Sequence, residues 1–278
     1  MKSLDSVIQS FEIVLKNPKI MLITLISYIL VFLILFSAGF LIGISNIIST
    51  LDTDSFPSEL YSNFPLVVGV IILCSIILFL IAPFPIGMLI SSGIQVLKGK
   101  LSLSKAFDEA KRKYFSILGV SLISTAAFIA IVVSLLLPLI LSWDFKPLFD
   151  FFVVFDIVLF LIASFLLSVF FFQANTLVFT ENKKAFEAVK RSFYIGKQKF
   201  LSILATLFFL LIIVFGIGFV EAIIKGILSI LFIIDLSLLA IFAILFFIFV
   251  EIPINCFLFS VSGIIPVVFY YNYNLKKF

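Results

Sequence analysis

Long apolar segments alternate with short polar ones along the whole chain. Apolar runs of about 20 residues or more, enough for one helical crossing of a bilayer, recur from Ile20 almost to the C-terminus. We therefore predict an all-α fold, a polytopic bundle of six transmembrane helices. The predicted spans are Ile20–Ile44, Pro65–Ile90, Phe115–Leu141, Phe151–Leu177, Phe200–Val220 and Ser237–Val268.

A short amphipathic helix is predicted before the first, third and fifth spans. Each contains a small residue, a Phe and an acid in succession, with a base four positions after the acid, where the two charges meet on one helical face. We predict three tandem units, at about 1–100, 101–179 and 180–278, within a single integral membrane domain of residues 1–278. The copies are Ser10-Phe11-Glu12 with Lys16, Ala106-Phe107-Asp108 with Arg112, and Ala185-Phe186-Glu187 with Arg191.

The helical period assigns an apolar face to each of these short helices, Met1–Asn17, Ser102–Tyr114 and Thr180–Lys199. We expect the face of the first helix to lie on the membrane surface or against the bundle, and the face of the third helix to point inward. They consist of Leu4, Val7, Ile8, Phe11 and Leu15 in the first helix, Leu103, Ala106, Phe107, Ala110 and Tyr114 in the second, and Phe186, Val189 and Phe193 in the third.

Other local signals predict irregular geometry. The segment Ala82-Pro83-Phe84-Pro85 lacks two backbone donors and should kink or break the second span, and Pro253 should kink the sixth. Gly39 and Gly43 have the spacing that lets two membrane helices approach closely. Two spans do not use all the residues after Phe200, so we place Glu221–Leu236 in an external interfacial helix.

Composition excludes a soluble fold and gives little support to catalysis. The chain is 63% hydrophobic and 12% charged, whereas soluble domains carry roughly 25% charged residues. It contains no His, which is the commonest general base and metal ligand, and Cys74 and Cys256 have no metal-binding spacing. No nucleotide-binding loop or nucleophile motif is present. We therefore expect a protein that is not an enzyme and has no metal or cofactor.

The placement of charge predicts the topology. Seventeen of the 19 Lys and Arg residues lie in 1–19, 91–114, 174–199 and 276–277, while the polar turn Ser45–Phe64 has acids and no base. Because cytoplasmic loops are rich in Lys and Arg, both termini should be cytoplasmic in the cell membrane. Topology and anionic lipid account for these bases, so no nucleic-acid partner is expected.

Two kinds of residue are candidates for function. Acids inside a membrane are costly and are by default functional hypotheses. Asp156 is near the outer end of the fourth span and has an interfacial or a functional role. Glu251 is near the middle of the sixth span, where we expect no basic partner because Lys225 should lie at the outer surface. The candidate lipid-facing bases are Lys105, Lys111, Arg112, Lys183, Lys184, Lys190 and Arg191.

These candidates favour two functions. The basic amphipathic helices suit a noncatalytic membrane module that binds anionic lipid headgroups or a membrane protein partner. The alternative is a transporter or pore for a small solute or ion, with Glu251 holding a proton or contacting water beside the Pro253 kink.

The sequence resembles a set of uncharacterised prokaryotic six-span membrane families, which are similar to the membrane domain attached to some glycerophosphodiester phosphodiesterases. The resemblance rests on Ala106-Phe107 and Ala185-Phe186 before a span, Asn17-Pro18 before the first span, and the ending from Pro266 to Asn272. It covers nearly the whole chain and implies the six-span fold. The phosphodiesterase barrel with its metal ligands is missing from this sequence, so the resemblance does not imply that activity.

Overall fold

The computed structural model describes residues 2–52, 64–142, 146–231 and 245–277, and all regular structure in these ranges is helical. Six of the helical segments are long and apolar enough to cross a membrane, which confirms the predicted all-α polytopic bundle. They are α2 (Lys19–Asp52), α4 (Phe64–Ile81) with α5 (Pro83–Leu97), α6 (Leu103–Leu141), α7 (Lys146–Phe171) with α8 (Ala174–Thr180), α10 (Phe200–Leu231), and the π turn η1 (Phe247–Glu251) with α12 (Ile252–Asn272). The shorter elements are α1 (Lys2–Lys16), α9 (Ala185–Gln198) and the 3₁₀ turn η2 (Leu275–Lys277).

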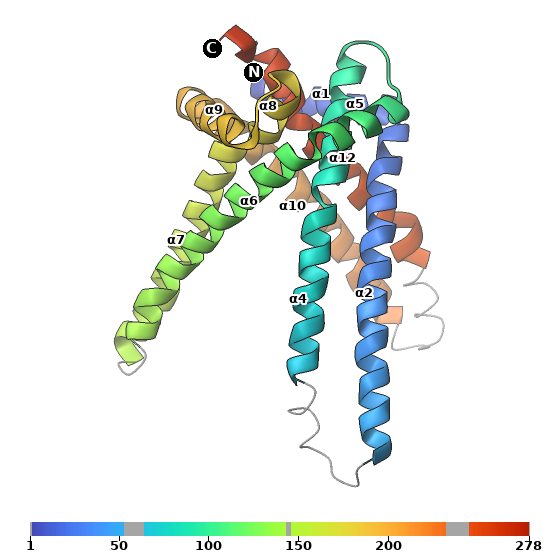
Figure 1. Ribbon diagram of the computed structural model, residues 1–278, viewed down its shortest axis with the longest axis vertical. Coiled ribbons are helices and arrows are strands. Elements are labelled where there is room, and N and C mark those ends of the chain that lie inside the picture. Colours follow the sequence, from blue (N-terminus) through green and yellow to red (C-terminus); the bar gives the residue numbers. More distant parts are fainter. Residues whose placement is uncertain (1, 53–63, 143–145, 232–244, 278) are drawn as a thin grey trace.

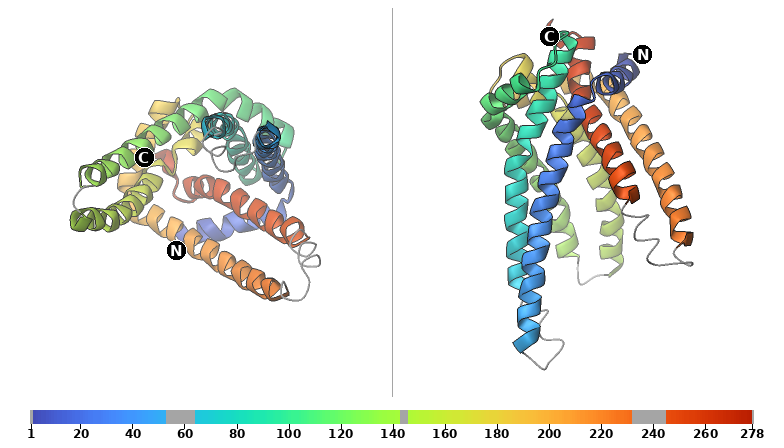
Figure 2. Two further views of the ribbon diagram at one scale, coloured as in Figure 1. Left: turned by 90° about the horizontal axis from the view of Figure 1, so that it is seen from below. Right: turned by 90° about the vertical axis from the view of Figure 1, so that its right-hand side faces the viewer.

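The spans form three antiparallel hairpins that extend from one common end (Figure 1). The hairpins are α2 with α4, α6 with α7, and α10 with α12. Both termini, α1, α5, α8 and α9 lie at the common end. Seen from the opposite end, the three hairpins stand apart from one another (Figure 2). An even number of spans returns the chain to the side where it began, as the predicted topology requires.

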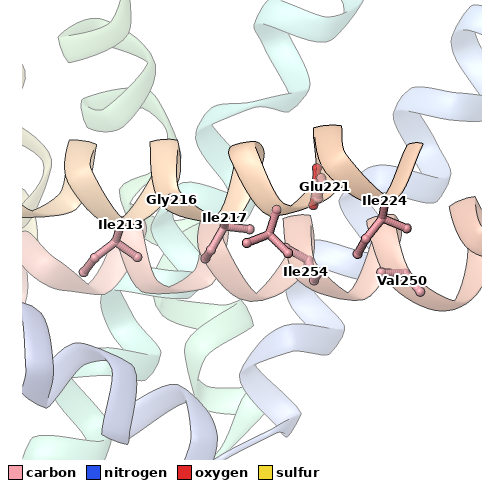
Figure 3. A pocket seen from close by; sticks show the side chains of 8 residues that line it. Ile213, Gly216, Ile217, Glu221, Ile224, Val250 and Ile254 are labelled. Atoms are coloured by element: carbon pink, nitrogen blue, oxygen red, sulfur yellow. The ribbon is translucent and has the colours of Figure 1, made fainter. Parts of the chain in front are cut away.

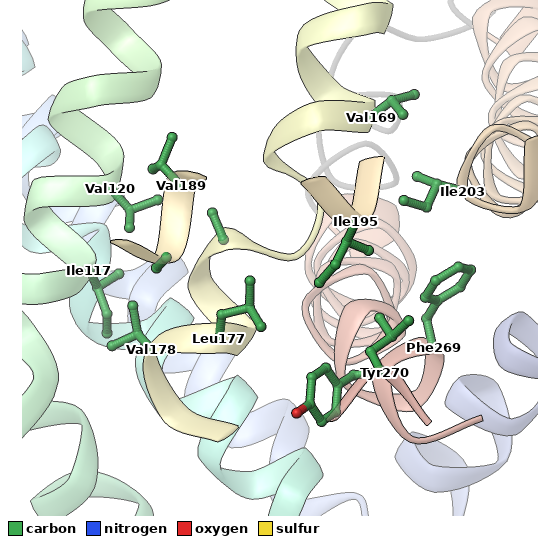
Figure 4. Close-up of a cluster of buried hydrophobic side chains, with 13 residues drawn as sticks. Ile117, Val120, Val169, Leu177, Val178, Val189, Ile195, Ile203, Phe269 and Tyr270 are labelled. Atoms are coloured by element: carbon green, nitrogen blue, oxygen red, sulfur yellow. The ribbon is translucent and has the colours of Figure 1, made fainter. Parts of the chain in front are cut away.

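The buried core lies at the common end, where the three hairpins meet. One cluster joins α6, α7, α8, α9, α10 and α12 (Figure 4). A second cluster joins α1, α2, α5 and α12. Fully buried members of these clusters include Ile117, Leu177, Ile203, Leu89 and Phe269. The short elements therefore hold the hairpins together, and most of the span surface is left for the surrounding apolar medium.

The central helix of this arrangement is α12. In α12, 44% of the most apolar segment is buried, against 17% or less in each of the other five spans. It approaches α5 through two glycines, because the side chain of Leu89 lies over Gly263 and that of Ile264 lies over Gly93. The predicted approach site at Gly39 is wrong, since a Cβ there would meet nothing within 4 Å. The side-chain surroundings of Gly43 lie outside the described residues.

Prolines interrupt the second and sixth spans, as predicted. The helix breaks at Ala82 between α4 and α5, with Pro83 as the first residue of α5. In the last span, the π turn η1 ends two residues before Pro253, and the amide of Ile252 donates to the carbonyl of Phe247. Pro253 cannot donate a backbone hydrogen bond, and the wider turn just before it accommodates the missing bond.

Three predicted helix boundaries are wrong. The segment Ser102–Tyr114 is not a separate helix, because α6 continues through it from Leu103 to Leu141, with Ser102 as its N-cap. Residues 45–52 continue α2 and do not form a turn. Residues 221–231 continue α10, so the expected external helix Glu221–Leu236 does not form over that part, and residues 232–236 lie outside the described ranges.

Candidate functional site

We call the end that carries both termini, α1, α9 and the first turns of α6 the terminal face (Figure 1). All seven candidate lipid-facing bases lie on it. Lys105, Lys111 and Arg112 are exposed on the first turns of α6, and Lys184 and Lys190 are exposed at the start of α9 and on it. Lys183 and Arg191 are half-buried. The structure thus gathers on one face bases that are about 80 residues apart in the sequence.

A basic pocket lies along α9, with a volume of about 390 Å³. Its lining residues are Lys183, Glu187, Lys190, Arg191 and Tyr194. The Arg191 guanidinium lies 5.6 Å from the centre of the Tyr194 ring, a cation–π distance, and it donates to the carbonyl of Leu275 at 3.3 Å. The pocket therefore combines a held guanidinium, two lysines and an aromatic wall.

Glu181 contacts two of the bases that line this pocket, and no sequence motif marks it as a site residue. Its carboxylate is 3.6 Å from the Lys183 ammonium and 3.7 Å from Nε of Arg191. It also accepts a hydrogen bond of 3.2 Å from the hydroxyl of Tyr270 on α12. Glu181 precedes the repeat motif of α9, and only the fold shows that it faces Arg191.

A second polar pocket, of about 290 Å³, lies on the first turns of α6 and is lined by Lys105, Asp108, Glu109 and Arg112. Behind it, the Ser91 hydroxyl donates to Glu109 and accepts from the side-chain amide of Gln95 at 3.2 Å. The side-chain oxygen of Gln95 accepts from the backbone amide of Ser102 at 2.9 Å. This pocket carries two acids and two bases, so it has no net charge. Its contacts tie the start of α6 to α5.

The ion pairs only partly follow the predicted spacing. Glu12 and Lys16 form the predicted pair at 3.0 Å. Asp108 and Arg112, both within the described residues, do not form one. Exposed pairs of this kind contribute little to stability, commonly about 0.3–0.5 kcal/mol on a helix.

The first short helix packs on the bundle through a face that overlaps the predicted apolar face only in part. Its buried residues are Ser3, Ser6, Val7, Ser10, Ile13 and Val14. Leu4, Ile8 and Leu15, from the predicted apolar face, are 38%, 49% and 66% exposed. Small residues allow α1 to approach α10 and α12 closely, as is typical of helix contacts in membrane proteins. An apolar stripe is left exposed, with charged residues on its other side.

The three copies of the motif place their Phe differently, because Phe11 packs edge-on against Phe257 of α12 with ring centroids 5.4 Å apart, whereas Phe107 and Phe186 are exposed. The small residue contacts the bundle: Ser10 and Ala106 are fully buried, and a Cβ at Gly119 would lie 2.7 Å from that of Ala185. The next residue, about 100° further around the helix, is the Phe. Phe107 is 47% and Phe186 is 74% exposed, so the prediction that Phe186 points inward is wrong. The acid follows and is exposed in all three copies.

The structure pairs one of the two candidate intramembrane acids. Glu251 forms an ion pair with Lys225 of α10, so the expectation that Lys225 lies too far away is wrong. The pair forms because α10 continues past Glu221 and runs beside the π turn. The other acid, Asp156, is buried, and its Oδ2 has no hydrogen-bond partner among the described residues.

Comparisons with known proteins leave the chain without a match: neither a family model, nor a curated protein, nor a solved structure corresponds to it. The chain is a multi-pass protein by its six apolar helices.

Proposed function

We propose that the protein is a noncatalytic module of the cell membrane whose terminal face is cytoplasmic and binds anionic phospholipid headgroups. The observation that carries this proposal is the basic pocket on α9, with the exposed Phe186 beside it on the same helix. A cationic pocket next to exposed aromatic side chains matches the boundary between headgroups and acyl chains.

The distribution of charge supports this orientation and ligand. The segments 1–19, 91–114, 174–199 and 276–277 hold 17 bases and 6 acids, whereas the remainder of the chain holds 2 bases and 9 acids. The terminal face is thus strongly positive. A positive face next to a membrane draws anionic lipid toward it, at about 1 kcal/mol for each base near the surface.

The positions of the short helices support contact with the membrane surface. In α1, the exposed stripe of Leu4, Ile8 and Leu15 lies between the buried face and the charged residues. A helix lying in the interface needs this order, with one side on the bundle, one in the acyl chains and one in water. The motif residues of α6 and α9 follow the same order, which also supports three repeated units.

The α9 pocket suits a phosphodiester with a single negative charge. Lys183, Lys190 and Arg191 carry three positive charges, and Glu181 and Glu187 offset two of them. The guanidinium of Arg191 is held by Glu181 and the carbonyl of Leu275, so it places a fixed positive charge in the pocket. The acidic headgroup of phosphatidylglycerol has the corresponding charge.

The full-length protein in lipid nanodiscs tests this proposal. Lys183→Gln combined with Lys190→Gln should lose most of the enrichment of phosphatidylglycerol over phosphatidylcholine that the parent shows, because two of the three pocket bases are removed. Lys98→Gln combined with Lys100→Gln removes the same charge from the turn between α5 and α6 and should lose less. Added salt should weaken the enrichment. If both double variants behave alike, the pocket has no specific role; if the parent shows no enrichment, the face serves a protein partner or topology alone.

Transport is the second candidate, and the ion pair of Glu251 with Lys225 makes it less favourable. A carboxylate that is paired with a lysine is not free to carry a cation. A flux assay in liposomes checks this point with Glu251→Gln, which keeps the shape of the side chain and removes its charge. Flux that depends on pH in the parent and loses that dependence in the variant would favour transport.

A further inference from the structure

A groove of about 370 Å³ runs between α10 and α12 (Figure 3). It lies on the second half of α10 and the first part of the last span, away from the terminal face. Its walls are formed by Ile213, Gly216, Ile217, Val220, Glu221 and Ile224 of α10, with Val250 and Ile254 opposite. All but Gly216 and Glu221 are branched aliphatic side chains. Gly216 has no side chain, and the π turn widens the facing helix at Val250, so the two helices do not close over this stretch.

One end of the groove carries excess negative charge. Glu221 lines the groove, and Lys225 one helical turn further on forms an ion pair with Glu251 from the opposite helix. Lys225 is the only base in the sequence between Phe200 and Asn272. One lysine therefore serves two carboxylates, and the charge of Glu221 is not compensated within this hairpin.

We propose that this groove binds one acyl chain of an aminophospholipid, with the ammonium of its headgroup against Glu221. The aliphatic wall fits a hydrocarbon chain, and the excess carboxylate fits a primary amine, which donates charge-assisted hydrogen bonds. A choline headgroup has a positive charge but no N–H to donate, and a glycerol headgroup has no positive charge. This site is separate from the α9 pocket, because the two share no lining residue and the groove selects the opposite charge.

Two glycines of α10 provide a matched pair of variants. A Cβ at Gly216 or at Gly218 would meet nothing within 4 Å, so the first carbon of a larger side chain has room at both positions. Gly216 lines the groove and Gly218 does not. Gly216→Leu should therefore fill the groove, whereas Gly218→Leu adds the same side chain outside it.

The experiment is native mass spectrometry of the full-length protein in detergent, titrated with phosphatidylethanolamine, phosphatidylcholine or phosphatidylglycerol of identical acyl chains. The parent should bind one molecule of phosphatidylethanolamine in about tenfold preference over phosphatidylcholine, which is about 1.4 kcal/mol, the order of one charge-assisted hydrogen bond. Gly216→Leu should abolish this binding, and Gly218→Leu should retain it. Glu221→Gln, which is nearly isosteric, should lose the headgroup preference and keep the weaker binding of the acyl chain.

Two results would overturn the proposal. The first is equal binding of phosphatidylethanolamine and phosphatidylcholine by the parent. The second is the same binding by Gly216→Leu as by Gly218→Leu when both variants elute as monodisperse protein. If Gly216→Leu does not fold, Glu221→Gln still tests the proposal. Loss of the headgroup preference in this variant supports the proposal, and an unchanged preference overturns it.

Discussion

The close approach of α5 and α12 makes Gly263 the position at which one added methyl group should be most informative. A Cβ at Gly263 would lie 2.8 Å from Cδ1 and 3.3 Å from Cβ of Leu89. Leu89 is fully buried, so its side chain has little room to move. Overpacking of this kind costs about 1–3 kcal/mol. In water, Ala would recover about 1 kcal/mol of helix propensity, but the backbone of a membrane span is helical in either state, so this gain should be small.

Gly263→Ala should therefore destabilise the bundle by about 1–3 kcal/mol. For chains of roughly this size, each kcal/mol lowers Tm by about 2–4 °C. Cys256 on α12 provides the assay, because it is 2% exposed and becomes reactive when the helices separate. In a Cys74→Ser background, the labelling of Cys256 by a fluorogenic maleimide is followed as the temperature rises.

Two controls make this prediction specific. Gly69→Ala and Gly218→Ala add the same methyl group where a Cβ would meet nothing within 4 Å, and they should leave Tm unchanged. The double variant Gly263→Ala/Leu89→Ala removes the side chain that clashes, so its loss of stability should be smaller than the sum of the two single losses. A Tm for Gly263→Ala equal to or above that of the parent would refute the argument that this approach is sterically closed.

Three further predictions concern charge and topology. Asp156→Leu should stabilise the protein by about 1–3 kcal/mol, because a buried oxygen without a partner is removed; a lower Tm would mean that the carboxyl has a partner. Lys225→Glu and Glu251→Lys should each lower Tm by creating like charges, and the two together should restore it; failure of the double variant would show that the pair is not a direct contact. In a Cys-free background, Ser104→Cys should resist an impermeant maleimide in intact cells and Ser55→Cys should react; the reverse pattern would invert the proposed orientation.

The sequence predicts the number of spans well because bilayer thickness sets a minimum apolar length, and no soluble alternative fits that pattern. It also predicts the break at Pro83, because a missing backbone donor acts locally. It fails at the ends of helices. The change from polar to apolar residues at Tyr114 and Phe115 was interpreted as a helix boundary, but no proline or glycine stands there. Such a change marks the expected membrane surface, and α6 passes through it without interruption.

Periodicity in α1 identifies an apolar stripe correctly but does not decide between its two predicted surroundings, the membrane surface and the bundle. In a soluble protein, the stripe of Leu4, Ile8 and Leu15 would be the core face. Next to a membrane, lipid competes for large apolar side chains, and protein contacts favour small ones such as Ser6 and Ser10. The helical period therefore cannot decide which face packs on protein.

Contacts between distant segments account for the remaining misses in the candidate site. Tyr270 meets Glu181 only because α12 returns beside the end of α8. Lys225 meets Glu251 only because α10 remains helical beyond the point at which an external helix was predicted. Neither pairing has a local sequence signal, since each depends on which helices become neighbours.

The concentration of the core at the terminal face explains how one chain can present two different lipid sites. The short helices α1, α5, α8 and α9 pack into the core at the terminal face, so a held guanidinium such as Arg191 can select headgroups by charge. Away from the terminal face, the spans bury little of their surface. A groove such as the one at Gly216 can therefore accept a hydrocarbon chain without displacing helix contacts. Because the two sites have opposite net charge, they should select different headgroups. Gly216→Leu should therefore leave the phosphatidylglycerol enrichment at the α9 pocket unchanged. If this variant loses both that enrichment and the binding of phosphatidylethanolamine, the protein has one shared annulus of lipid and not two separate sites.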